Sequence, residues 1–244
     1  MSVRKFELTT ECITVSGIKL FRIRALVAFG NVKVGELGGF VEKEENLSHD
    51  NRAWIYGNAR IYGNAEICGN ARICGDAEIY GNARICGDAE IYGNAEIYGN
   101  AEIYGNAEIY GNARIYGNAE IYGNARICGD AEIYGNARIY GNAEIYGNAE
   151  IYGNARICGN ARICGDAEIS KPTHVLVIGA LGSRNGCTTF FRNKENTILV
   201  RCGCFANNIV KFEKAVEETH GGTKHEWTYK AAIALAKLQI YLED

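Results

Sequence analysis

The segment after residue 172 contains the residues whose types and spacing best fit an anion-binding site. A glycine-rich turn, Gly182-Ser-Arg-Asn-Gly186, offers backbone N–H groups, and its arginine offers a guanidinium. Both groups bind phosphates and carboxylates. The candidate ligand-binding residues are Arg184, Asn185, Thr188, Thr189, Arg192, Arg201 and Cys204. The alternative is a plain β-hairpin, because Asn-Gly is the strongest short-range signal for a hairpin turn.

The same segment holds a set of cysteines and histidines that bears on metal binding. Cys202 and Cys204 form a Cys-x-Cys pair, which Cys187, His220 and His225 would have to complete for zinc. This spacing is weak evidence, since structural zinc sites usually use closely spaced ligand pairs of the Cys-x₂₋₄-Cys type. Free thiols on neighbouring strand positions are the better interpretation, so we predict no metal and no cofactor.

A hexapeptide repeat occupies the centre of the chain, and the candidate residues follow it directly. Its pattern is Ala, Arg or Glu, Ile, Tyr or Cys, Gly, Asn or Asp, and alanine recurs twenty times from Ala53 to Ala167. Alternation of small or aliphatic residues with polar ones predicts a short strand with Ala and Ile inward. Gly-Asn predicts a corner, because both residues tolerate positive φ. Short internal repeats of this kind are typical of β-solenoids.

With three strands to a coil of about 18 residues, the repeat predicts six to seven coils. Ile55 with Ala59, Ile61 with Ala65 and all later pairs match the pattern of the hexapeptide-repeat superfamily. The chain resembles that superfamily, which implies a left-handed parallel β-helix. General crossover rules would favour a right-handed coil. The predicted fold class is therefore mainly β.

The superfamily includes acyltransferases, carbonic anhydrases and non-enzymes, so the resemblance alone assigns no activity. Its acyltransferases need a catalytic histidine and a loop inserted into the coil, and its carbonic anhydrases need a histidine cluster. Residues 53–168 contain neither a histidine nor an insertion. His49, His174, His220 and His225 all lie outside the repeat. We therefore predict that the chain is not an enzyme and has no catalytic residues.

The non-repetitive ends predict two further domains beside the β-helix, residues 53–170. Residues 1–52 are expected to form an N-terminal β cap, because an open solenoid end exposes unpaired backbone and apolar core. Strands are predicted at 6–8, 13–15 and 18–23, followed by an irregular first coil at 35–47. Residues 171–244 are expected to form a small α+β domain, with strands at 174–180, 187–192 and 197–202 and helices at 208–220 and 227–242.

One outer face of the β-helix carries an unbroken column of tyrosines, one from every third hexapeptide. This predicted interface consists of Tyr62, Tyr80, Tyr98, Tyr116, Tyr134 and Tyr152. Tyrosine is enriched at protein interfaces, which favours a partner or a homo-oligomer. Simple cross-strand stacking on a solvated sheet is the alternative.

Charge and cysteine usage limit the class of protein. Residues 53–168 carry eight arginines and fifteen acidic side chains. Both signs occur along each column, unlike the single sign of a nucleic-acid duplex, so direct nucleic-acid binding or mimicry is not expected. Six of the ten cysteines replace the repeat tyrosine, and no signal peptide or membrane span is apparent. We therefore expect free thiols in a bacterial cytoplasm.

Two segments resemble proteins encoded by phages and prophages. They are the entry GELGGFVEKEENLSHDNRAWIYGNA and the tail with VIGALGSRNGCTTFF, CGCF and ETHGG. The resemblance implies a hexapeptide-repeat protein of phage origin. From it we predict a non-enzymatic binding protein that acts on a host component, as an inhibitor of anti-phage defence. The target would be a host protein or an anionic, nucleotide-type ligand. A self-assembling structural protein, or an acyltransferase-like enzyme, is the alternative.

Overall fold

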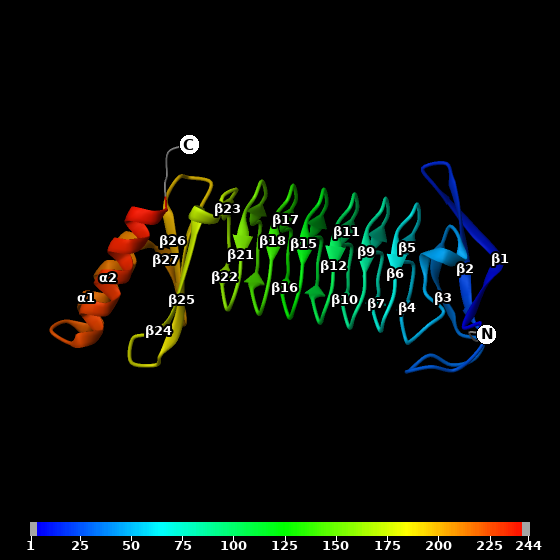
Figure 1. Ribbon diagram of the computed structural model, residues 1–244, viewed down its shortest axis with the longest axis horizontal. Coiled ribbons are helices and arrows are strands. Elements are labelled where there is room, and N and C mark those ends of the chain that lie inside the picture. Colours follow the sequence, from blue (N-terminus) through cyan, green and yellow to red (C-terminus); the bar gives the residue numbers. More distant parts are fainter. Residues whose placement is uncertain (1–3, 241–244) are drawn as a thin grey trace.

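The computed structural model of the protein describes residues 4–240, which form a rod (Figure 1). A β cap lies at the N-terminal end, a parallel β-solenoid forms the shaft, and a sheet with two helices lies at the C-terminal end. The predicted fold class is confirmed in this architecture. The handedness of the coil stays a prediction from the superfamily resemblance.

The N-terminal cap is an antiparallel hairpin that merges into the solenoid. Strand β1 (Phe6–Val15) pairs with β2 (Ile18–Ala25), where two separate strands had been predicted at 6–8 and 13–15. Strand β3 (Leu37–Val41) pairs antiparallel with β2 and parallel with β5 (Arg60–Ile61). With the 3₁₀ helix η1 (Glu44–Asn46) and a bridge from Leu47 to Ile67, this segment makes the irregular first coil.

The shaft consists of short strands, one in each hexapeptide, from β4 (Trp54–Ile55) to β23 (Glu168–Ile169). Each pairs in parallel with its counterpart in the next coil, as β11 (Glu96–Ile97) does with β14 (Arg114–Ile115). The pairs build three sheets that run the length of the shaft. Backbone bonds such as Tyr98 N–H to the Ile115 carbonyl (3.0 Å) satisfy the polar backbone from coil to coil.

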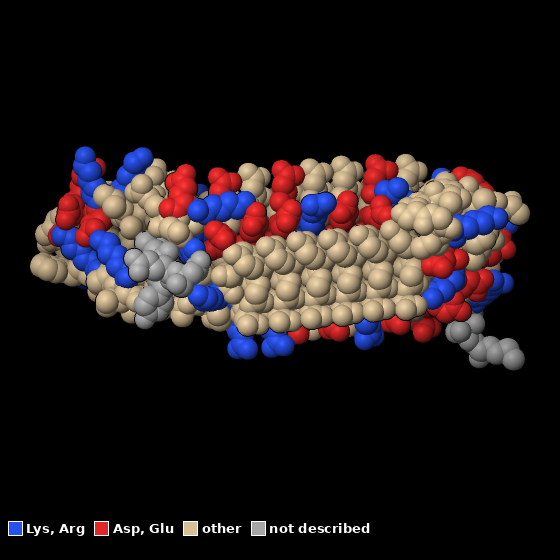
Figure 2. Space-filling model, turned by 90° about the horizontal axis from the view of Figure 1, so that it is seen from above, with Lys and Arg blue, Asp and Glu red and all other residues tan. Residues whose placement is uncertain are grey.

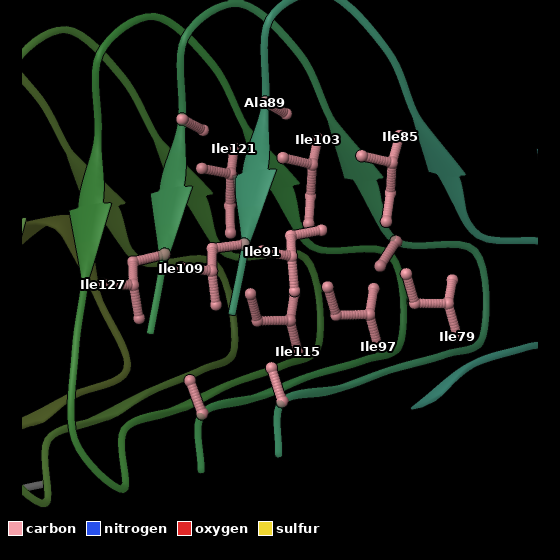
Figure 3. Packing of buried hydrophobic residues seen from close by; sticks show 14 of the residues in the cluster. Ile79, Ile85, Ala89, Ile91, Ile97, Ile103, Ile109, Ile115, Ile121 and Ile127 are labelled. Carbon is pink, nitrogen blue, oxygen red and sulfur yellow. The ribbon is translucent and has the colours of Figure 1, made fainter. Parts of the chain in front are cut away.

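The core is built from the repeat's alanines and isoleucines, as predicted. From Ala53 to Ile169, every one of them is at most 1% exposed. Figure 3 shows three rows of isoleucines, one from each sheet, converging on the axis: Ile79, Ile97 and Ile115; Ile85, Ile103 and Ile121; Ile91, Ile109 and Ile127. Isoleucine suits this place, since a β-branched side chain loses little further freedom in a strand.

The C-terminal end is a four-stranded antiparallel sheet covered on one face by helices. After η2 (Pro172–His174), the sheet order is β24 (Val175–Leu181), β25 (Gly186–Arg192), β26 (Ile198–Cys202) and β27 (Phe205–Asn208). Helices α1 (Ile209–His220) and α2 (Lys224–Gln239) lie on its outer side (Figure 1). The sequence did not predict β27, and α2 begins at Lys224 rather than at the expected position 227.

The inner face of this sheet closes the last coil of the solenoid. Phe191 belongs to the same buried cluster as the solenoid core. The Thr189 hydroxyl accepts a hydrogen bond from the Arg162 N–H (3.0 Å), and Lys194 N–H donates to the Asp166 carbonyl (3.0 Å). At the other end, Phe6 and Ile23 join the cluster around Trp54. Both ends of the core are therefore covered.

Two repeat cysteines correct the expectation of free thiols. Cys68 and Cys86, one coil apart, are joined by a disulfide. Their Cα atoms lie 4.6 Å apart, because stacked positions are separated only by the inter-strand spacing, and this is within disulfide reach. Eight other cysteines, among them Cys74, Cys128 and Cys158, are free. Among residues 4–240, no helix is long and apolar enough to cross a membrane.

A buried lysine in the cap gives the stability a predictable pH dependence. Lys5 is 2% exposed, and its ammonium donates to the Ala53 carbonyl (2.9 Å). Burial lowers its pKa from 10.5 to about 8. Between these values the unfolded chain binds more protons than the folded one, so stability rises with pH. We expect the free energy of unfolding in urea to increase by about 2 kcal/mol from pH 7.5 to 9.5.

The matched variants are Lys5→Met, which should abolish this rise, and Lys19→Met, which should retain it because Lys19 is exposed. A pH-independent stability in the wild-type protein would contradict the burial of a titrating ammonium.

Candidate functional site

The predicted anion-binding turn connects β24 and β25 as a hairpin. Its Asn185 N–H donates to the Gly182 carbonyl (3.3 Å), and Asn185 has a φ of 48°. Arg184 and Asn185 are exposed at the tip. Gly182 is buried, and a Cβ there would clash with the Tyr229 hydroxyl. This turn therefore packs directly on helix α2.

The other predicted ligand residues do not gather at this turn. Thr188 and Thr189 are buried on opposite faces of β25: the Thr188 hydroxyl donates to Cys202 Sγ (3.2 Å), and Thr189 faces the solenoid. Arg192 is buried at the far end of β25, where its Nε donates to Asn196 Oδ1 (2.8 Å). Strand alternation separates Thr188 from Thr189, since neighbouring side chains point to opposite faces of a sheet, and Arg192 is separated by its distance along β25.

Of the remaining two, only Cys204 lies near Arg184. Arg201 is the cross-strand partner of Thr189, so it lies on the solenoid face, beside Cys164 of the last coil. Cys204 is exposed in the β26–β27 turn, and the structure brings it to the same pocket as Arg184. The candidate residues therefore lie in three separate places: the contact with the solenoid, the far end of β25, and a pocket at the hairpin turns.

That pocket lies where both hairpin turns meet the ends of the helices. It has a volume of about 430 Å³. Ser183, Arg184 and Cys204 contribute from the turns, and Val216, His220 and Tyr229 from the helices. In Figure 1 the β24–β25 turn and the α1–α2 connection lie at the same, lower end of the domain. Sequence reasoning missed the helical side because nothing local links residues 181–186 to residues 212–229.

Aromatic rings form one connected wall of the pocket. Phe205 and Phe212 have ring centroids 5.0 Å apart, Phe212 and Tyr229 5.6 Å, and Tyr229 and His220 5.6 Å. The Tyr229 hydroxyl lies 3.6 Å from Cys202 Sγ. Burial, with the neighbouring Cys202, raises the pKa of Tyr229 to about 12, so its hydroxyl stays protonated at neutral pH.

The cysteines and histidines weighed for zinc do not converge. His220 and His225 have ring centroids 5.8 Å apart, but no group of three His, Cys, Asp or Glu side chains within residues 4–240 is placed to hold a metal ion. His49 stacks on Phe6 (4.4 Å), and its Nδ1 accepts the Lys5 N–H (3.1 Å). His174 is buried beside Ser170 at the end of the solenoid.

The tyrosine column is the second candidate site, and it forms a stacked ladder. Ring centroids of successive members lie 4.9 to 5.1 Å apart, with planes within 6° of parallel. Beside it, exposed asparagines form a second ladder, in which each Nδ2 donates to the next Oδ1, as from Asn100 to Asn118 (2.9 Å). This Tyr–Asn strip comprises Tyr62, Tyr80, Tyr98, Tyr116, Tyr134 and Tyr152 with Asn64, Asn82, Asn100, Asn118, Asn136 and Asn154, and the glycines between them.

Charged columns border the Tyr–Asn strip on both sides. Figure 2 shows the strip as a continuous band without Lys, Arg, Asp or Glu. On one side Arg114 bridges Glu96 (3.5 Å) and Glu132 (3.3 Å). On the other, Arg138 pairs with Glu120 (3.0 Å). At the other two corners of the shaft, cysteine or aspartate interrupts the same pattern.

The N-terminal hairpin limits how much of the strip is accessible. Tyr62 is only 8% exposed and packs with Leu20 and Phe40, and Tyr80 contacts the same cluster. The expectation that all six tyrosines form an open face is therefore wrong for Tyr62, since β2 and β3 continue its sheet. The open strip extends towards the C-terminal end from Tyr98.

Most hydroxyls of the ladder are free. Tyr62 and Tyr152 donate to Glu78 (2.5 Å) and Glu168 (2.7 Å). The hydroxyls of the four tyrosines between them make no hydrogen bond to the described part of the chain. Burial, then the nearby Glu132, raises the pKa of Tyr116 to about 12, so its phenol is a protonated donor at physiological pH.

Comparison with known proteins supports the repeat architecture. The model of a family described as YdcK Beta solenoid repeat matches residues 53–69. Those residues span the first strands of the regular shaft, β4 to β6 (Glu66–Ile67). No curated protein matches the chain significantly. The family match and the three parallel sheets together identify the chain as a repeat β-solenoid protein.

Proposed function

We propose that the protein is a non-enzymatic binding protein that holds a protein partner along the Tyr–Asn strip. The observation that carries this proposal is the open part of the strip, Tyr98 to Tyr134, where free hydroxyls stand beside an ordered row of asparagine amides. Stacking holds these rings in one orientation before any partner arrives. A partner therefore gains hydrogen bonds at a low cost in side-chain entropy.

The charged borders contribute specificity rather than affinity. Their ion pairs are at least partly exposed, and pairs of this kind stabilise a protein by less than about 1 kcal/mol. A partner with the wrong charge pattern would have to face the unpaired charges along the columns. One example is Arg156, which is stacked beside Arg138 and makes no ion pair within the described part of the chain. Like charges across an interface disfavour binding and so select among partners.

Two alternatives have less support. An acyltransferase-like enzyme would need a loop that walls a site, whereas one strand follows another without interruption from β4 to β23. A filament formed end to end would need exposed coil edges, whereas Phe6 and Phe191 belong to the buried clusters over the two ends.

The biological setting of the proposal rests on resemblance. The entry segment and the tail resemble proteins of phages and prophages, and the repeat resembles the left-handed hexapeptide superfamily. We therefore propose a phage or prophage protein that binds a host component and inhibits an anti-phage defence. This step is analogy, because a fold does not fix a function. The Cys68–Cys86 disulfide removes the free-thiol argument for a cytoplasmic location.

The test is quantitative capture of partners from host lysate with the Tyr98→Glu/Tyr116→Glu variant. Two carboxylates in the centre of the strip would be buried without a partner charge, so we expect at least a tenfold loss of captured protein, measured by mass spectrometry. The matched control is Tyr104→Glu/Tyr122→Glu, a stacked pair on another face (5.4 Å), which should capture normally. Equal capture by all three proteins would exclude the strip.

Self-association is the other occupant to distinguish, since we also expect a homo-oligomer. Light scattering of the same variants separates the two. A wild-type mass that is a multiple of 26.7 kDa, and that falls to 26.7 kDa only in Tyr98→Glu/Tyr116→Glu, would assign the strip to a second copy of the chain.

A further inference from the structure

We propose that the C-terminal pocket is a separate binding site for a small aromatic anion, a molecule with one or two fused rings and a single carboxylate or similar group. The pocket lies between the β24–β25 turn, the β26–β27 turn and both helices. Its volume of about 430 Å³ is within the usual range for small-molecule sites. This site lies beyond the solenoid and is independent of the Tyr–Asn strip.

The aromatic and aliphatic lining of the pocket suits a flat, apolar ligand. The Phe212 ring contacts the rings of both Phe205 and Tyr229, and Val216 adds an aliphatic surface. Phe212 and Val216 are at most 4% exposed, so the domain core holds this surface in place. A ligand ring that stacks on or meets the edge of these rings gains the geometry that aromatic pairs prefer.

The charge of the lining points to an anion. Arg184 stands at the mouth with Ser183 beside it, and no Asp or Glu is among the residues that line the pocket. Arg184 makes no ion pair with another side chain in residues 4–240. Its planar guanidinium can donate two parallel hydrogen bonds to a carboxylate. An apolar pocket with one uncompensated cation therefore favours a singly charged aromatic ligand.

A nucleotide is a poorer fit than the sequence suggested. Phosphates are bound by several convergent donors, and the residues expected to supply them are elsewhere. Thr188 and Thr189 are buried on opposite faces of β25, and Arg192 lies at its far end. Arg184 is thus the arginine left at the pocket.

The experiment is isothermal titration calorimetry of the full chain with three probes. They are 2-naphthoate, its uncharged analogue 2-naphthamide, and adenosine 5′-monophosphate. We expect saturable binding of 2-naphthoate, about tenfold weaker binding of 2-naphthamide, and no binding of the nucleotide, because one charge-assisted contact contributes about that factor.

Variants locate the site. Arg184→Gln should weaken 2-naphthoate about tenfold and leave 2-naphthamide unchanged. Thr219→Trp, from an exposed position in the lining, should fill the pocket and abolish both. Arg156→Gln, an exposed arginine on the shaft, is the control and should bind like the wild type.

Circular dichroism verifies that the variants fold. Tighter binding of the nucleotide than of 2-naphthoate would overturn the proposal, as would binding that neither Arg184→Gln nor Thr219→Trp alters. The Tyr98→Glu/Tyr116→Glu protein should bind 2-naphthoate normally, so this result and the partner capture can fail independently.

Discussion

Replacing Gly105 by alanine should destabilise the protein by about 3 kcal/mol, from two separate causes. Gly105 has a φ of 81°, in the left-handed region that costs an L-residue about 1 kcal/mol or more. A Cβ there would also lie 2.7 Å from the carbonyl oxygen of Gly123 and 3.0 Å from its nitrogen, in the next coil. Both are backbone atoms, so the coils would have to separate locally.

Gly159 provides the matched control for this prediction. It occupies the same place in the repeat with a φ of 69°, but a Cβ there would meet nothing within 4 Å, because no regular coil follows. Gly159→Ala should therefore show only the conformational cost, about 1 kcal/mol. Urea unfolding of both variants measures the difference. Equal losses would mean that the close approach of successive coils is not what fixes glycine at this position.

Replacing Phe191 by alanine should cost about 3 to 5 kcal/mol and open the C-terminal end of the solenoid. Phe191 is fully buried in the cluster that continues the isoleucine rows. Its loss leaves a cavity between the last coil and β25, and the Arg162 N–H bond to Thr189 lies at the same contact. Hydrogen exchange at Arg162 should accelerate, and dynamic light scattering should detect concentration-dependent assembly through the exposed coil edge.

Phe205→Ala is the control for the junction. Phe205 is a half-buried phenylalanine of the same domain that packs against Phe212, on the helix side. It should lose less stability and leave exchange at Arg162 unchanged. Assembly in Phe205→Ala but not in Phe191→Ala would mean that the sheet does not cap the core.

The solenoid could be predicted almost completely, because its information is local. Each isoleucine is buried for the same reason as its counterpart in the preceding coil, so one hexapeptide specifies strand, corner and inward face together. The position of Ile109 within its own hexapeptide is enough to predict that it is buried. The stacking of Tyr98 on Tyr116 follows from the coil period of 18 residues.

The ends could be predicted only in outline, because their contacts are long-range. The Thr189–Arg162 bond joins residues 27 positions apart, and Tyr229 packs on Gly182 from a helix that begins only at Lys224. The closeness of the candidate residues in sequence predicts one site, whereas strand alternation and distance along β25 divide them among three places. The Cys68–Cys86 disulfide is a different case. Its sequence separation of 18 is one full coil, so the repeat alone places the two cysteines next to each other, whereas the expectation of free thiols depended on the expected compartment.

The pairing of each strand with its counterpart one coil away has a consequence for how this molecule can vary. Ends and shaft meet only at the outermost coils of each end, where Tyr80 and Glu150 are still in contact with them, and every coil between presents the same edge above and below. Removing or duplicating one whole coil therefore leaves both junctions unchanged and alters the separation of cap and pocket by about 4.8 Å. The length of the shaft can therefore change only in steps of one coil. Because its units are nearly identical, unequal recombination within the coding sequence can reset that length in a single step.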